Sequence, residues 1–99
     1  MRKRLIMNGL NYRMTDDMRA VLAAVVDAVE PPWGFSICER TGLGSGVVYP
    51  VLERLMNAGV IRHEWESPPP DSRPRRRLYY PVYDPSWYRA NGLLPEASA

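Results

Sequence analysis

Three glycines, Gly42, Gly44 and Gly46, lie within five residues of each other in the stretch TGLGSG. Closely spaced glycines can cradle a phosphate, because their backbone N–H groups can approach the anion without obstruction from side chains. The dinucleotide-binding fingerprint, however, needs a preceding strand and one more residue in its spacing. The mononucleotide-binding loop needs a Gly-Lys-Ser/Thr sequence, which this stretch lacks. We therefore interpret the three glycines as a tight turn between two helices.

Residue types that carry catalysis or bind metals are scarce in this chain. It contains one histidine, His63, and one cysteine, Cys38, whereas a structural zinc needs four closely spaced nitrogen or sulfur ligands. Asp16 and Asp17 are adjacent, but they stand where the start of a helix is expected rather than as a catalytic pair. No Ser–His–Asp set can be assembled with any specificity. The sequence therefore predicts neither an enzyme nor a cofactor.

Charge is distributed unevenly along the chain, although the net charge is only +2. Residues 1–13 contain four basic residues and no acid, whereas residues 14–43 contain five acids and two arginines. Residues 72–80 again lack acids and contain Arg73, Arg75, Arg76 and Arg77. Two basic segments favour a polyanionic partner, because contacts with phosphates dominate the affinity for nucleic acids. The alternative is that each segment is simply a solvated tail or loop.

Two helices are predicted between the basic segments, ahead of a third. The first begins at Thr15, whose side chain can cap it, and is expected to continue until Pro31 and Pro32 stop it. Its apolar residues recur at helical spacing and predict a buried stripe: Met18, Val21, Leu22, Val25, Val26 and Val29. The second helix covers residues 33–42, with Gly42 as its C-terminal stop. Its apolar side consists of Phe35, Ile37 and Cys38.

The third predicted helix covers residues 45–58, with Ser45 as its N-cap. Pro50 lies near the helix start, where few backbone N–H groups have partners, and Gly46 can accommodate the proline ring. Ala58 and Gly59 end the helix. Its buried face is expected to consist of Val48, Val51, Leu52, Leu55 and Met56.

Two segments with alternating polarity, residues 60–66 and 76–82, predict antiparallel strands. In the first, Ile61, His63 and Trp65 share one face; in the second, Leu78, Tyr80 and Val82 are aligned. Between the strands, four prolines exclude regular structure and predict a long loop that carries arginines. A short helix is expected from Asp84 to Gly92, and residues 93–99 are expected to be loose. Near the N-terminus, Asn8-Gly9 suits a tight hairpin turn, although a flexible basic arm is equally compatible.

Together these elements predict an α+β fold that is mainly helical. Residues 15–83 would form a three-helix winged helix-turn-helix with a two-stranded antiparallel wing. Residues 1–14 would form a basic arm or short hairpin, and residues 84–99 a short helix with a loose tail. In a helix-turn-helix the second helix enters the major groove of DNA. The tip of a wing can reach a phosphate or the adjacent minor groove.

Residues 33–82 resemble the phenolic-acid-decarboxylase-regulator (PadR) family of winged-helix transcription factors. The resemblance rests on the stretches GVVYP, LERLMNAGVI and RRRLYY and on Trp65 in the first strand. It implies a bacterial or phage protein that binds promoters as a repressor. The family normally continues into a long C-terminal helical region that dimerises, whereas only about one short helix follows the strands here. In the family this region often also encloses an effector pocket. The family's mode of dimerisation and of ligand sensing is therefore not expected to carry over, and we expect no small-molecule effector.

The resemblance also implies which residues contact DNA. Ser45, Gly46, Val47 and Tyr49 would lie at the DNA-facing start of the recognition helix, residues 45–58. Pro50 and Arg54 lie on the exposed side of the same helix. The loop at residues 67–77 would contact the backbone or the minor groove through Arg73, Arg75, Arg76 and Arg77.

The sequence thus predicts a sequence-specific regulator that binds double-stranded DNA and represses transcription. One alternative is a winged-helix module that binds another protein, for which the acidic first two helices offer a surface. A second alternative is an architectural or recombination-directing DNA-binding protein. Measuring salt-dependent binding to random duplex DNA would separate the protein-binding module from the regulator and from the architectural DNA-binding protein.

The cysteine count, the length of the apolar runs and the resemblance lead to expectations about compartment and assembly. The single cysteine fits a reducing compartment, and no apolar run reaches the ~18 residues needed to span a membrane, so we expect a cytoplasmic protein. Repressors of this type usually bind palindromic sites as dimers. We therefore expect a weak homodimer that uses both termini, with the C-terminal contribution coming from Trp87, Tyr88, Leu93 and Leu94.

Overall fold

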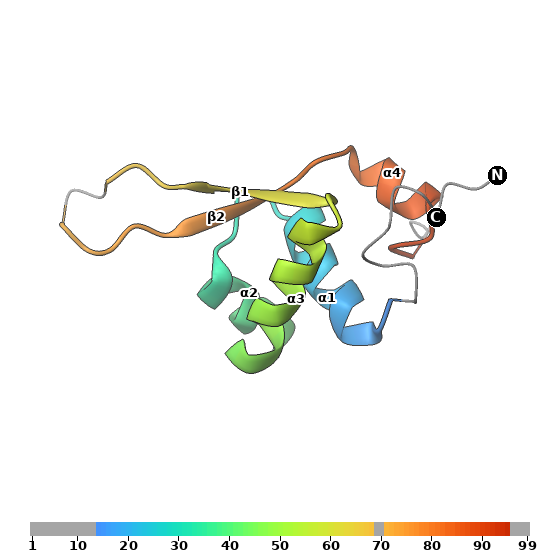
Figure 1. The fold of residues 1–99 in the computed structure, drawn as a ribbon, viewed down its shortest axis with the longest axis horizontal. Helices are drawn as coiled ribbons and strands as arrows, with labels where there is room; N and C mark the ends of the chain where they lie inside the picture. Colours follow the sequence, from blue (N-terminus) through green and yellow to red (C-terminus); the bar gives the residue numbers. More distant parts are fainter. Residues whose placement is uncertain (1–13, 69–70, 96–99) are drawn as a thin grey trace.

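The computed structural model describes residues 14–68 and 71–95. The basic arm or hairpin expected at the N-terminus lies outside the described residues, except for Met14. The described residues form a small α+β domain with four helices and a two-stranded antiparallel sheet (Figure 1). The elements follow one another as α1 (Asp16–Val26), α2 (Gly34–Thr41), α3 (Ser45–Asn57), β1 (Ile61–Trp65), β2 (Arg77–Pro81) and α4 (Pro85–Ala90). The coarse α+β prediction is confirmed.

Helix α1 begins as predicted and ends earlier than predicted. The Thr15 hydroxyl accepts a hydrogen bond from the backbone N–H of Met18 at 3.1 Å, which satisfies one of the donors that every helix start leaves unpaired. The helix ends at Val26 rather than at the prolines, and Val29 is fully exposed, so its assignment to the buried stripe is wrong. After the helix the chain turns, and the carbonyl of Pro32 pairs with the N–H of Tyr79 in β2.

Helices α2 and α3 are joined by the predicted tight turn. Gly42 ends α2 in the left-handed conformation, with φ of 77°, which a residue with a side chain adopts at a cost. Gly44 is the N-cap of α3, so Ser45 is the first helical residue and its predicted role as cap is wrong. Phe35 is 62% exposed, which contradicts its predicted place on the apolar side of α2.

The core lies where the first three helices meet the base of the sheet. Val48, Leu52 and Leu55 of α3 are buried, as predicted, against the stripe of α1 and Ile37 of α2. Val51 and Met56 pack at the margin of this core.

The sheet is a hairpin that extends away from the helices (Figure 1). Its strands pair in antiparallel register, with Ile61 opposite Pro81 and His63 opposite Tyr79. Only Ile61 of β1 and Tyr79 of β2 are buried, because the strands leave the core after their first contact with it. The alignment of Leu78, Tyr80 and Val82 therefore does not mark the buried face.

The outer edge of β2 is tied to the segment that precedes α2. The backbone N–H of Tyr79 donates to the carbonyl of Pro32 at 2.9 Å, and Trp33 forms an isolated bridge with Leu78. Proline lacks an N–H group, but its carbonyl can still accept from a neighbouring strand. This pairing fixes the direction of the hairpin relative to α2 and α3.

Helix α4 closes the other side of the domain, and the residues after it are packed rather than loose. Tyr88 is fully buried, and its hydroxyl donates to the carbonyl of Val60 and accepts from the N–H groups of Val82 and Tyr83. Leu93 and Leu94 are 4% and 3% exposed, so the prediction of a loose tail is wrong as far as Leu94.

The burial of these residues also bears on the expected homodimer. Tyr88, Leu93 and Leu94 belong to the core of their own chain. They are therefore not available to a dimer interface, which corrects the prediction for these three residues, whereas Trp87 is only partly buried. Within the described residues, no helix combines the length and apolar character needed to cross a membrane.

The Tyr88 hydroxyl gives a direct test of how the base of the hairpin is held. Tyr88→Phe should lower the free energy of unfolding by about 2–3 kcal/mol, because one carbonyl and two N–H groups lose a buried partner. Tyr80→Phe is the matched control, because the Tyr80 ring lies half-buried beneath Arg62 on the hairpin surface. Loss of the Tyr80 hydroxyl should change the free energy of unfolding by less than about 0.5 kcal/mol. Urea denaturation of the two variants measures the difference, and equal effects would contradict the role of the Tyr88 hydroxyl.

Candidate nucleic-acid interface

The first two turns of α3 form an exposed corner of the domain. Ser45, Gly46, Val47, Tyr49 and Pro50 are all exposed, as is Arg54 one turn further along the helix. A Cβ atom added at Gly44 or Gly46 would meet no other atom within 4 Å, so both glycines face open space. Pro50 cannot donate to the carbonyl of Gly46 in the preceding turn, which leaves that acceptor without its helical partner. The start of the corner thus consists of small residues, so that its backbone can approach a surface closely.

A hollow that we call the notch lies between this corner and the hairpin. It has a volume of about 430 Å³. Its walls come from the start of α2, the exposed face of α3 and both strands with the adjoining loop: Trp33, Gly34, Tyr49, Glu53, Trp65, Arg75, Arg76, Arg77 and Tyr79. The fold therefore brings Tyr49 of the predicted recognition helix into one concave surface with three of the four predicted loop arginines.

Tyr49 reaches the floor of the notch because residue 34 has no side chain. A Cβ atom placed on Gly34 would lie 2.0 Å from the Tyr49 hydroxyl oxygen and 2.3 Å from the ring carbon that bears it. Such distances are far below contact between non-bonded atoms, so any larger residue at position 34 would displace the ring. Sequence reasoning missed Gly34, since a glycine at the start of a helix carries no visible signal of a distant tyrosine.

The arginines of the notch are held against aromatic rings and an acid. The guanidinium of Arg76 lies 3.9 Å from the ring centre of Trp33, within the range of a cation–π contact. Arg77 lies 5.2 Å from the ring centre of Trp65, and its Nη1 atom is 3.6 Å from a carboxylate oxygen of Glu53. Arg75 is exposed. Positive charge is therefore concentrated on the hairpin side of the notch.

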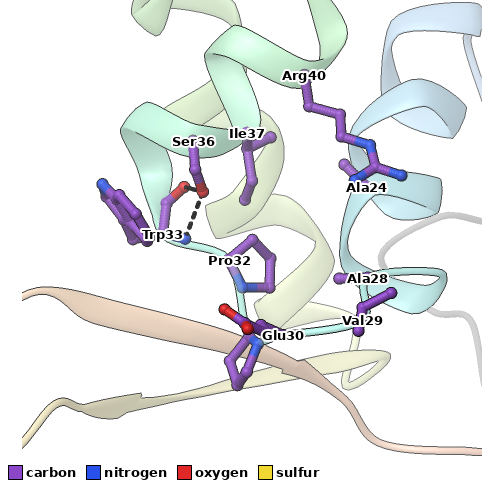
Figure 2. A pocket seen from close by; sticks show the side chains of 10 residues that line it. Ala24, Ala28, Val29, Glu30, Pro32, Trp33, Ser36, Ile37 and Arg40 are labelled. Atoms are coloured by element: carbon purple, nitrogen blue, oxygen red, sulfur yellow. Dashed lines mark hydrogen bonds between the residues drawn. The ribbon is translucent and has the colours of Figure 1, made fainter.

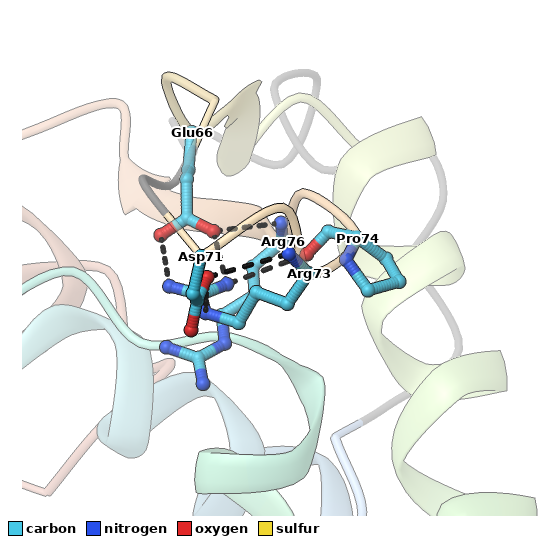
Figure 3. A network of polar contacts seen from close by, with 5 residues as sticks. All are labelled: Glu66, Asp71, Arg73, Pro74 and Arg76. Carbon is cyan, nitrogen blue, oxygen red and sulfur yellow. Dashed lines mark hydrogen bonds and ion pairs between the residues drawn. The ribbon is translucent and has the colours of Figure 1, made fainter.

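Glu66 organises the loop beyond the strands (Figure 3). Its carboxylate accepts from Nη1 of Arg73 at 2.7 Å and from the backbone N–H of Arg76 at 3.0 Å. Asp71 accepts from the backbone N–H of Arg73 at 3.3 Å. The fourth predicted arginine, Arg73, is thus paired with an acid rather than projecting alone, and it is not among the residues that line the notch. Sequence reasoning placed Glu66 only at the end of the first predicted strand, because the register of the hairpin was needed to place it beside Arg73.

The ion pair has a defined dependence on pH. The hydrogen bond from the Arg73 side chain is the main reason that the pKa of Glu66 lies below its usual value of 4.5. Because the folded pKa is lower than the unfolded one, the pair stabilises the loop above pH 4.5 and loses this effect as pH falls through the folded pKa. At neutral pH the charge of Arg73 is therefore largely compensated within the loop.

A second hollow, of about 320 Å³, lies between α1 and α2 (Figure 2). Glu30 and Arg40 stand at opposite ends of it, and its wall includes the fully exposed Val29. In its wall, the Ser36 hydroxyl accepts from the backbone N–H of Trp33 at 2.9 Å, which caps the start of α2. Neither hollow holds a set of metal ligands: the described residues contain no group of three or more His, Cys, Asp or Glu side chains that could bind an ion.

Comparison with models of protein families, with curated proteins and with solved structures finds no match for this chain. The assignment of a function therefore depends on the geometry and charge of the notch and of the α3 corner.

The close approach of Tyr49 to Gly34 can be tested by filling the space. Gly34→Ala should move the Tyr49 ring out of the notch, because the added methyl group would occupy its place. The ring is the end of a side chain that is 46% exposed, so the free energy of unfolding should change by less than about 1 kcal/mol. Nuclear Overhauser contacts between the ring of Tyr49 and residue 34 measure the displacement. Persistence of those contacts, or a much larger loss of stability, would contradict the described packing.

Proposed function

We propose that this protein is a sequence-specific regulator that binds duplex DNA and represses transcription through a winged helix-turn-helix of the PadR type. The observation that carries the proposal is the notch, in which the exposed face of α3 and an arginine-rich hairpin form one concave surface. Helices α2 and α3 act as the helix-turn-helix, and the hairpin acts as the wing. The resemblance of residues 33–82 to the PadR family supports the same function.

The corner of α3 suits entry into the major groove, which is wide enough to admit one helix. Ser45 and Gly46 are small and leave the backbone accessible. Val47 is 37% exposed, and its methyl groups suit contact with the methyl group of thymine. The Tyr49 hydroxyl, and Arg54 further along, suit contacts with phosphates, which position a protein without reading the sequence.

The hairpin supplies most of the electrostatic attraction in this proposal. Arg75 is exposed and needs no rearrangement to reach a phosphate. Arg76 and Arg77 are held beside the notch by Trp33 and Glu53, so their guanidinium groups are positioned before DNA arrives. Arg73 contributes less, because Glu66 already neutralises it.

A protein-binding module is the second candidate. The hollow between α1 and α2 favours it, since Val29 is fully exposed there beside an acidic and a basic side chain. Binding to random duplex DNA that weakens steeply with salt would favour a DNA-binding function over the protein-binding module, and its absence would favour the module. Selection of bound sites from a pool of genomic fragments would then identify the operator.

The charges of the hairpin predict opposite effects of two substitutions on duplex binding. Arg75→Ala should flatten the slope of log affinity against log salt by roughly 0.9, the value for one lost phosphate contact. Glu66→Gln should steepen it by up to roughly 0.9, because Arg73 becomes available while the amide oxygen can still accept from the Arg76 N–H. Fluorescence anisotropy titrations at several salt concentrations measure both slopes.

Glu64→Gln is the matched control for Glu66→Gln. It makes the same change in charge two residues earlier, inside β1, and its carboxylate pairs with Arg62 rather than with a loop arginine. It should alter the slope clearly less. If Arg75→Ala leaves the slope unchanged, the arginines form a solvated loop and the proposed role of the hairpin is wrong.

A further inference from the structure

The notch contains exposed aromatic rings whose flat faces have no stacking partner in a fully paired DNA duplex. Trp65 is 55% exposed and Tyr49 is 46% exposed, and both line the same hollow. Single exposed apolar residues are common on protein surfaces, but exposed aromatic rings grouped in a concavity mark a binding site. In an intact duplex the flat faces of the bases are stacked on one another, so only base edges, sugars and phosphates are presented to a protein. The rings of the notch therefore lack a counterpart in an intact duplex.

Positive charge next to these rings defines the remaining chemistry of the ligand. Arg77 lies 5.2 Å from the ring centre of Trp65, which leaves much of the indole surface open. Arg75 and Arg76 line the same hollow, against a single acid, Glu53. A ligand that combines a flat ring with a negative charge a few ångströms from the ring fits this arrangement. An unpaired nucleotide has both parts, since its base can stack on an aromatic side chain and its phosphate can pair with arginine.

We propose that the notch binds one unpaired nucleotide of a DNA strand, with its base against Trp65 and its phosphate beside Arg75 and Arg77. The volume of about 430 Å³ lies within the range of about 300–1,000 Å³ that small-molecule pockets occupy. This inference rests on the proposed function, because it takes the ligand to be DNA. It adds which form of DNA the protein prefers. The protein favours duplexes that contain an extruded or unpaired base, or a junction with a single strand, over fully paired duplexes.

The test compares three labelled DNAs: a fully paired duplex, the same duplex with a one-nucleotide bulge, and one of its strands alone. Fluorescence anisotropy gives the affinity of the wild-type protein and of three variants for each. Trp65→Ala removes the stacking surface, and Trp65→Phe keeps a flat ring. Phe35→Ala is the matched control, because Phe35 is an aromatic residue of similar exposure, 62%, that does not line the notch.

The wild-type protein should bind the bulged duplex about tenfold more tightly than the paired one, as expected when one stacked base is added. Trp65→Ala should reduce this ratio to about one, Trp65→Phe should restore most of it, and Phe35→Ala should keep it. Circular dichroism confirms that the variants are folded.

The outcomes separate the two proposals. Tight binding of the paired duplex with a ratio near one in the wild-type protein, or a ratio that survives Trp65→Ala, overturns the nucleotide site and leaves the regulator intact. Binding of the bulged duplex and the single strand without the paired duplex supports the nucleotide site and overturns the regulator. If the protein binds none of the three DNAs, both proposals are wrong.

Discussion

The hydrogen bond from the Tyr79 N–H to the Pro32 carbonyl is the constraint on which the candidate site depends. It joins the outer edge of β2 to the segment before α2, and so fixes the hairpin beside the helices. On the other side, the buried Tyr88 hydroxyl binds Val60, just before β1, and Val82, just after β2. A two-stranded hairpin is marginal by itself. Held at its edge and at both ends of its base, it can extend from the core and still present its side chains at defined positions.

That attachment also accounts for the shape of the notch. Because the pairing places Trp33 next to Leu78, the ring of Trp33 comes within reach of Arg76, which lies just before β2. Gly34, the next residue, leaves room for the Tyr49 ring. The backbone contact thus brings the hairpin beside α2 and α3, and the concave surface follows from the packing of these elements.

The charge presented at the candidate site is smaller than the run of arginines indicates. Arg73 is paired with Glu66, and Arg77 lies near Glu53, so acids from other segments compensate part of the positive charge. Partial compensation holds long side chains in place and limits repulsion between neighbouring arginines. Under the proposed function, it also makes the attraction to phosphates depend on carboxylates that can be substituted individually.

The sequence by itself determined what depends on local contacts. The cap at Thr15, the left-handed stop at Gly42 and the buried face of Val48, Leu52 and Leu55 were predictable, because each is set within one or two helical turns. The order of the elements and the arginine-rich loop followed in the same way. Only the tertiary structure decided the early end of α1, the burial of Leu93 and Leu94, the pairing of Glu66 with Arg73 and the place of Tyr49 over Gly34. Each of these depends on which distant segments meet, and the spacing of residues along one segment carries no record of that.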